Sequence, residues 1–201
     1  MIKFHKIISL IFQPLLMPTF GMLLLMNMSV FSILPISWRW IAILGTLLFT
    51  AILPAIPILL MYRRGEINDL FISKREERTM PYLFTFFSYF FWVLFLWRTM
   101  QFPSFIIAMG GAAGLSIFII VFINLKWKIS AHLSGMGGLT GAVFGVCYRM
   151  AINPLWFFIF LFVLTAMVAI SRIELKAHSP GQLLAGFVLS FFLVFSTCFI
   201  F

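Results

Sequence analysis

The sequence predicts an all-α fold: a polytopic membrane bundle of about six to seven transmembrane helices, forming one domain over residues 1–201. Of its 201 residues, 63% are hydrophobic and only 9% are charged, whereas a soluble domain carries about 25% charged residues. The mean hydropathy is +1.14. Apolar runs recur at about the 20 residues that a helix needs to cross a bilayer. Such a chain cannot cover a water-facing surface, so we expect an integral membrane protein.

Seven apolar segments are candidates for the spans: residues 7–28, 38–62, 81–98, 103–125, 132–150, 154–171 and 182–201. Pro14 and Pro18 predict that the first is kinked or lies partly in the interface. The third is short. In the fifth, Gly137, Gly141 and Gly145 recur every four residues and predict a smooth ridge for close helix packing. Gly110 and Gly114 indicate the same for the fourth.

Seven crossings would divide the polar connections between two membrane faces. The N-terminus and the loops 63–80, 126–131 and 172–181 share one face, which carries 11 of the 14 cations and all five acids. No charged residue or histidine falls near the centre of a span. Since ionisable groups at that depth mark ion pathways, a coupled transporter or channel is disfavoured. Any chemistry is expected near one surface.

The +9 charge of the chain bears on its partners and location. Cations in short loops between spans set topology or contact lipid phosphates, so we expect membrane lipids and no nucleic acid as partners. The face that carries 11 of the 14 cations is therefore expected in the cytoplasm. A bacterial inner (cytoplasmic) membrane is the expected location. If the cations of the candidate site are removed from the count, the margin is five against three, and the side of the site stays open.

The strongest polar cluster reads Ser171-Arg172, five residues, His178, and then Gln182. Pro180 suits the first turn of a helix. A helix that begins there would direct backbone N–H groups at an anion. An imidazole beside fixed cations suits phosphoryl transfer, which spreads negative charge over the transferred group.

A second cluster, Lys128-Ile129-Ser130-Ala131-His132, begins the fifth span. Ser130 is a candidate N-cap, and its hydroxyl could also bind a phosphate oxygen. Both interpretations hold together, because a cap that directs amides outward is also an anion site.

The loop 63–80 holds a charge run with Lys74, Arg75 and Arg78. A solvated juxtamembrane run and a phosphate-binding segment are both consistent with it. The five acids are too few and too scattered for a typical Mg²⁺ site, so we expect no metal and no cofactor.

Taken together, the three clusters resemble the motifs of the type 2 phosphatidic acid phosphatase (PAP2) superfamily over residues 64–190. Ser171, Arg172 and His178 match its motif Ser-Arg-x5-His-x3-Asp. Ser130 and His132 match Pro-Ser-Gly-His, with Ile129 and Ala131 at the other positions. Lys-x6-Arg-Pro is matched loosely. Counted back from Pro81, Met80 and Ser73 stand where Arg and Lys belong, and Lys74 and Arg78 are the nearest cations.

The resemblance implies a membrane phosphatase that hydrolyses a lipid phosphate or pyrophosphate of phospholipid or polyprenyl type. His178 would attack phosphorus and form a phospho-histidine, and His132 would protonate the leaving oxygen. The phosphoryl oxygens would be held by Arg172, Arg78, Lys74, Lys128 and Ser130. The family commonly works on the outer or luminal face.

Gln182 stands where the family has the Asp that orients the nucleophilic histidine. An amide can accept from the ring N–H but brings no charge, and Glu174 is a candidate to supply that charge. Two alternatives therefore stay open: a lipid phosphotransferase on the same scaffold, and a non-catalytic protein that binds a lipid head group. The 27 Phe residues suit an acyl or isoprenoid chain, or simply a lipid-facing surface.

Overall fold

A computed structural model describes residues 2–201, and every regular element in that range is helical. The α-helices are α1 (Ile2–Ile11), α2 (Met17–Asn27), α3 (Ile36–Leu47), α4 (Leu53–Arg63), α5 (Thr79–Leu94), α6 (Ser104–Lys126), α7 (Ala131–Arg149), α8 (Leu155–Glu174) and α9 (Pro180–Ile200). Short 3-10 turns cover Pro14–Leu16, Ser29–Phe31 and Glu76–Arg78, and π turns cover Leu48–Ile52 and Phe95–Thr99. The predicted all-α bundle is confirmed.

Six helical stretches are long and apolar enough to cross a membrane: Ile2–Asn27, Ile36–Arg63, Glu76–Thr99, Ser104–Lys126, Leu155–Glu174 and Pro180–Ile200. The third of these has 24 residues and is longer than the sequence predicted. The remaining predicted span forms α7, a 19-residue helix that is richer in glycine than α6, α8 and α9 and therefore less apolar. α7 packs against α2, α8 and α9 inside the bundle, where protein rather than lipid covers it.

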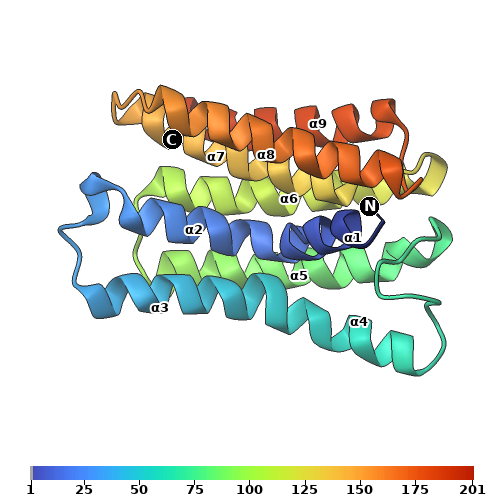
Figure 1. Ribbon diagram of the computed structural model, residues 1–201. Helices are drawn as coiled ribbons and strands as arrows, with labels where there is room; N and C mark the ends of the chain where they lie inside the picture. Colours follow the sequence, from blue (N-terminus) through green and yellow to red (C-terminus); the bar gives the residue numbers. More distant parts are fainter. Residues whose placement is uncertain (1) are drawn as a thin grey trace.

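The helices run side by side along one axis, so the loops gather at two ends (Figure 1). One end, here called the site end, holds the N-terminal helix and the loops 63–80, 126–131 and 172–181. The opposite end holds the remaining connections and the C-terminus. All three polar clusters of the sequence therefore lie at one end, as the span count predicted.

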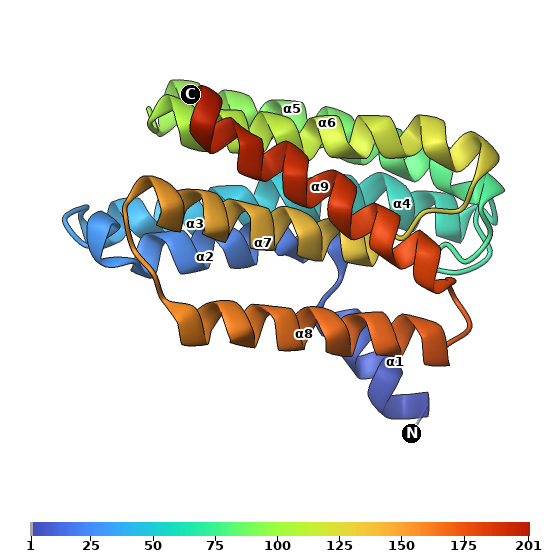
Figure 2. The same ribbon diagram turned by 90° about the horizontal axis from the view of Figure 1, so that it is seen from above.

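The first predicted span is broken where Pro14 follows Gln13. Gln13 has extended backbone angles, φ −64° and ψ 137°, because proline disfavours the helical conformation in the residue before it. At this break the chain changes direction, and α1 diverges from the line of α2 to pack against α8 (Figure 2). The helix also begins at Ile2, five residues before the predicted start.

The glycine ridge of α7 lies against α9, as predicted. A Cβ on Gly141 would lie 2.5 Å from the carbonyl oxygen of Phe191, and one on Gly137 would meet the carbonyl oxygen of Phe187. Gly145 faces the sulfur of Cys198, one of two buried free cysteines. The ridge allows the backbones of the two helices to approach closely, so α9 is held beside the start of α7.

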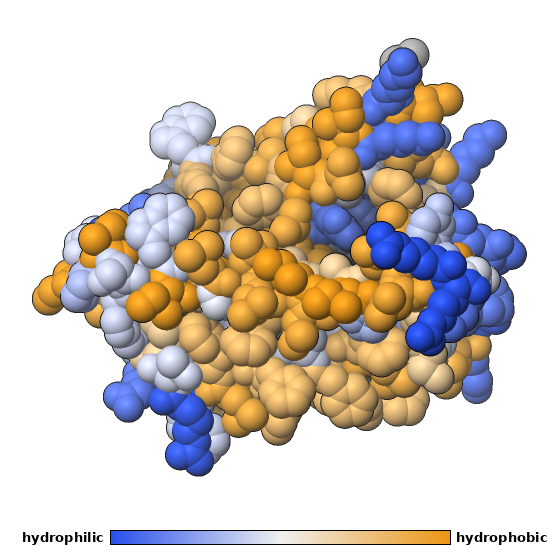
Figure 3. Space-filling view, turned by 90° about the horizontal axis from the view of Figure 1, so that it is seen from below, coloured by the Kyte–Doolittle hydropathy of each residue, from blue (hydrophilic) through white to orange (hydrophobic). Residues whose placement is uncertain are grey.

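The outer surface is dominated by hydrophobic side chains, while hydrophilic ones gather toward the two ends (Figure 3). Many large apolar side chains are exposed, for example Trp156 at 82% and Leu184 at 64%. In a soluble protein such a surface would aggregate, whereas in a bilayer it meets lipid. The surface therefore supports the assignment as an integral membrane protein.

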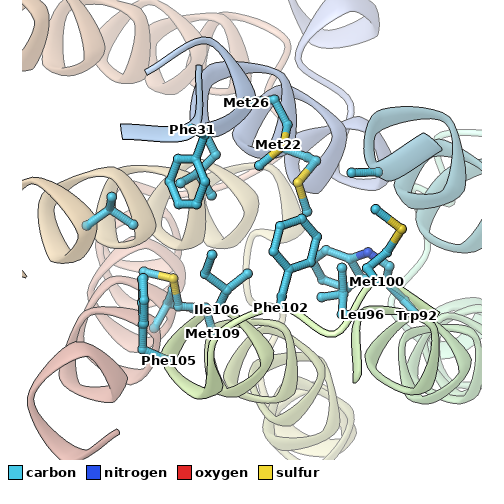
Figure 4. Packing of buried hydrophobic residues seen from close by; sticks show 14 of the residues in the cluster. Met22, Met26, Phe31, Trp92, Leu96, Met100, Phe102, Phe105, Ile106 and Met109 are labelled. Carbon is cyan, nitrogen blue, oxygen red and sulfur yellow. The ribbon is translucent and has the colours of Figure 1, made fainter. Parts of the chain in front are cut away.

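Away from the site end, buried side chains from α2, α5, α6, α7 and α9 form one apolar cluster. Figure 4 shows part of it, with Met22, Leu96, Phe102 and Ile106 gathered between the helices. These side chains are 5% exposed or less. The cluster closes the interior of the bundle at this depth.

Candidate functional site

A cavity of about 510 Å³ extends from the site end into the bundle. Its polar lining residues at the site end are Arg78, Tyr82, His132, Arg172 and His178, and most of the other lining residues are apolar. The cluster from Ser171 to Gln182, the cluster from Lys128 to His132 and the end of the loop 63–80 thus contribute to one cavity. His132, Arg172 and His178, which the sequence places at one membrane face, therefore converge on one cavity.

Arg78 lies in the 3-10 turn that leads into α5, and its side chain is only 4% exposed. Its Nε donates to the carbonyl oxygen of Ile72 at 2.7 Å, and one terminal nitrogen donates to that of Ile129 at 3.3 Å. The guanidinium therefore joins the loop 63–80 to the loop 126–131. It also lines the cavity, so it serves both the fold and the site.

Arg172 lies in the last turn of α8 and is 5% exposed, and its Nε has no hydrogen-bond partner. The ion pairs among residues 2–201 are Arg64–Glu66, Lys74–Glu77 and Arg75–Glu76, none of which involves a cavity residue. A buried guanidinium without a carboxylate partner is costly. The site therefore holds buried positive charge that no carboxylate among residues 2–201 neutralises.

His178 lies between α8 and α9, and its Nδ1 is 3.0 Å from Oε1 of Gln182. The same oxygen accepts from the backbone N–H of Ser179 at 3.2 Å, which fixes the amide at the start of α9. Because an amide oxygen only accepts, the imidazole donates from Nδ1. The other nitrogen, Nε2, is then unprotonated and is the nucleophilic atom of the ring.

Burial lowers the pKa of His178 to about 3, and the nearby charge of Arg78 is the next cause. Arg172 and Lys128 act in the same direction, while the bond to Gln182 opposes them. The ring is therefore neutral at physiological pH. A neutral imidazole with a free Nε2 is the form that can attack an electrophile.

Glu174, the alternative source of charge for His178, is exposed, and no hydrogen bond joins it to the ring in the part of the chain that the structure describes. The orienting contact belongs to Gln182. It fixes the tautomer, and it raises the pKa of the ring by less than burial and the nearby cations lower it.

His132 is buried at the start of α7, and its Nε2 is 3.1 Å from the backbone carbonyl oxygen of Ser9 in α1. A carbonyl oxygen only accepts, so Nε2 carries the proton. His5, which also belongs to α1, has its Nδ1 3.2 Å from Oγ of Ser171. α1 is thus part of the site wall. The sequence signal was the spacing of four between His5 and Ser9, which places both on one helix face.

Three predicted phosphate ligands do not line the cavity. Ser130 is fully buried as the N-cap of α7: its Oγ accepts from the backbone N–H of Leu133 at 3.4 Å. The side chain of Lys74 is 62% exposed and is 3.6 Å from Glu77. Lys128 lies closer to the cavity arginines than Lys74 does. Burial lowers its pKa, and the charges of Arg78 and Arg172 lower it further.

Tyr82 is a cavity residue that the motifs did not single out. It follows Arg78 by four residues, so both lie on one face of the helical stretch that begins at Glu76. Its phenol adds a hydrogen-bond donor beside the two guanidinium groups.

Among residues 2–201, no group of three or more His, Cys, Asp or Glu side chains is placed to hold a metal ion. What the site offers is buried positive charge, a neutral histidine with a free nitrogen, and a long apolar extension. That combination can bind an anionic head group attached to an apolar chain. No protein-family model, curated protein or solved structure matches this chain.

Proposed function

We propose that this protein is a membrane phosphatase that hydrolyses a lipid phosphate or pyrophosphate. One observation carries the proposal. Arg78 and Arg172 are buried in the same cavity without a carboxylate partner among residues 2–201, beside a histidine whose Nε2 is free. Buried cations that await an anion suit a phosphate, which accepts several N–H donors at once. The order of the three sequence motifs supports the same activity.

In the proposed reaction, Nε2 of His178 attacks phosphorus and the bond from phosphorus to the lipid oxygen breaks. Arg78 and Arg172 neutralise the charge on the transferred group, and Tyr82 donates to one of its oxygens. His132 is neutral in the empty site, because burial and the charge of Arg172 disfavour its charged form. The negative charge of the bound phosphate favours the charged form, so the ring takes up a proton from water at Nδ1 and gives it to the lipid oxygen. Water then attacks the phospho-histidine, His132 takes up a proton from it, and inorganic phosphate leaves.

The test is phosphate release from a panel of lipid phosphates and pyrophosphates by the full chain in lipid nanodiscs. We expect His178→Ala to reduce turnover by several orders of magnitude, because it removes the atom that forms the covalent intermediate. Acid quenching during turnover of the wild type should trap an acid-labile phospho-enzyme that His178→Ala lacks. Lys176→Ala, at an exposed position of the same loop outside the cavity, is the matched control and should retain turnover. Retention of more than about a tenth of wild-type turnover by His178→Ala would exclude a histidine nucleophile.

A second candidate function is binding of a lipid head group without hydrolysis. It is favoured by the hydrogen bond of His132 to the carbonyl oxygen of Ser9, which commits the single proton of the neutral ring to the protein. Lipid phosphates that bind the wild type tightly without release of phosphate would establish this function. Transfer of the phosphoryl group to an added lipid alcohol, in place of release, would instead identify a phosphotransferase.

A further inference from the structure

The apolar part of the cavity is long. Arg78 lies at its polar end and Leu96 lines it about 18 residues further along the α5 stretch. At 1.5 Å per residue this separation is about 27 Å. Because both residues line one cavity, it has room for an extended hydrocarbon chain from the arginine end to Leu96.

Most of the wall of this extension is apolar, and Gln13, Thr85 and Tyr89 are polar members of the lining. Ser134 and Ser190 face the cavity from α7 and α9, but their hydroxyls are bonded to each other at 2.6 Å. The hydroxyl of Ser116 is bonded to the carbonyl oxygen of Ala112 at 2.8 Å. Because these groups are satisfied within the protein, the wall offers them to no polar ligand. The extension suits an apolar chain.

The extension is closed at depth and open at its side. Leu96 and Ile106, two members of the apolar cluster of Figure 4, are 0% and 3% exposed and line the far part of the cavity. Nearer the site end, Leu10 of α1 and Leu59 of α4 line the cavity and are 59% and 41% exposed, so they form its rim. The two helices separate there because α1 turns away at Pro14. Figure 3 shows hydrophilic atoms recessed between hydrophobic ones on this face.

We propose that the cavity takes the chain of a lipid phosphate and selects the lipid by chain length, with Leu96 and Ile106 as the stop. The inference rests on the proposed function, which supplies the phosphate head group held by Arg78 and Arg172. The chain enters laterally between α1 and α4. A depth of about 27 Å exceeds one leaflet, about 15 Å, so chains longer than ordinary acyl chains still gain contacts.

Two small residues on α7 allow the depth to be changed. Gly138 and Ala142 both line the cavity, about 9 Å and about 15 Å along the helix from His132. A Cβ on Gly138 would meet nothing nearer than 3.9 Å, so a larger side chain has room to project into the cavity. Gly138→Leu and Ala142→Leu therefore place a plug at two depths one helical turn apart.

The experiment measures the binding of alkylphosphonates of increasing chain length, which carry a C–P bond that a phosphatase does not hydrolyse. Thermal stabilisation of the full chain in nanodiscs gives the affinity. We expect the affinity for wild type to rise up to about fourfold per methylene and then level off. The levelling point should move to shorter chains in Ala142→Leu and to still shorter chains in Gly138→Leu. Leu96→Ala should move it to longer chains. Gly111→Leu, on an exposed face of α6, is the control and should not move it.

A levelling point that is the same in wild type, both plugged variants and Leu96→Ala would overturn the proposal. Leu96→Ala enlarges the cavity, whereas Gly138→Leu and Ala142→Leu fill it. If the variants of one kind misfold, those of the other kind still test the chain-length selection. If the levelling point shifts as expected but no lipid phosphate is hydrolysed, the chain-length selection stands and the proposed hydrolysis fails. If phosphate is released at rates that the plugs leave unchanged for every chain length, hydrolysis stands and the selection fails.

Discussion

Arg172 is a side chain whose position favours function over stability. Its guanidinium is buried at the end of α8, lacks a partner at Nε, and faces no carboxylate among residues 2–201. Arg78 differs, since two backbone carbonyl oxygens accept from it. The two arginines of the site should therefore respond in opposite ways to removal of their charge.

We expect Arg172→Met to raise the free energy of unfolding by about 1–4 kcal/mol, because an apolar side chain of similar length replaces an uncompensated buried charge. The same change should lower phosphate release by about 100-fold or more. Arg78→Met should lower both stability and turnover, because it leaves the carbonyl oxygens of Ile72 and Ile129 without their donor. Thermal unfolding in detergent and a turnover assay measure the two effects.

The exposed Arg63 provides the control, and Arg63→Met should change neither quantity appreciably. A loss of stability in Arg172→Met as large as that in Arg78→Met would show that Arg172 has a structural partner in the folded protein.

Gln182 contacts His178 and, after burial and the charge of Arg78, is the next influence on the pKa of its ring. His178 must be neutral to attack, so its contribution is lost as the pH falls through its pKa of about 3. Gln182→Glu keeps the reach of the side chain and adds a negative charge, which raises this pKa. We therefore expect the acid limb of turnover to move to higher pH in Gln182→Glu. The pH profile of kcat on one substrate, compared with wild type, removes the contribution of the substrate itself.

Gln182→Asp restores the residue type of the resembled motif and should leave turnover intact or raise it, because a carboxylate fixes the tautomer and favours the charged ring. Glu174→Gln should leave turnover unchanged, since Glu174 is exposed and makes no contact with the ring. Turnover of both single variants on one lipid phosphate is the measurement. If Glu174→Gln were the damaging change, the orienting role assigned to Gln182 would be wrong.

Residue types and spacing could predict which side chains gather at one end of the bundle, but not the hydrogen-bond partner of each. Arg172, His178 and His132 converge because loops after alternate spans share one end, which follows from counting spans. The hydrogen bond of His132 to Ser9 and the exposure of Lys74 depend on tertiary packing, which local pattern does not encode. For the same reason, the two interpretations of Ser130 could be separated only by the observed N-cap bond.

At the scale of the elements, the contact between α7 and α9 depends on the absence of side chains on one helix face. A methyl group on Gly141 would lie 2.5 Å from the carbonyl oxygen of Phe191, a separation that real Cβ atoms do not adopt. Since the obstacle is backbone, a rotamer change cannot relieve it, and α9 must move.

We expect Gly141→Ala to lower the midpoint of thermal unfolding and to lower turnover as well, because α9 carries Gln182 beside His178. Gly111→Ala is the matched control, because nothing lies within 4 Å of its Cβ. In a helix interior alanine is favoured over glycine by up to about 1 kcal/mol, so this variant should be neutral or more stable. Equal destabilisation by both changes would point to a general requirement for glycine in place of the close contact.

Proline positions predicted the break in the first span, and the break is present at Gln13. The sequence did not predict where the released helix lies. α1 packs on α8, which is more than 140 residues away in the chain, and such long-range pairing is set by complementary surfaces.

At the scale of the whole molecule, the number of crossings decides where the two ends of the chain lie. α7 is less apolar than its neighbours, yet it runs along the bundle between loops at opposite ends (Figure 2). If α7 crosses with the six apolar stretches, the two ends of the chain lie on opposite sides of the membrane. We expect reporters fused to residues 1 and 201 to give opposite topology signals, and a cysteine introduced at exposed Lys176 to be labelled from the side of residue 1. Both reporters on one side would mean that α7 does not span the bilayer.

Composition and the length of the apolar runs together predicted the fold class, because a chain with 9% charged residues must be covered by lipid and runs of about 20 residues suit helices that cross it. The cavity could not be predicted in the same way. It exists because α1 leaves the line of α2, and because Gly138 and Ala142 leave space where larger residues would fill the bundle. The sequence thus predicts many of the residues of the site, but it does not predict the shape of the cavity that they line.

The side opening between α1 and α4 has a consequence for the direction of the proposed reaction. If hydrolysis occurs at Arg172 and His178, the uncharged lipid alcohol loses its hold on the guanidinium groups and can diffuse into the bilayer through this opening. Inorganic phosphate is insoluble in hydrocarbon and must leave through the loops into water. The two products would then enter different phases, so their recombination would be slowed by dilution in each phase. Mass action would then favour hydrolysis over its reversal, and the free energy of the ester bond would be the only energy source that the reaction needs.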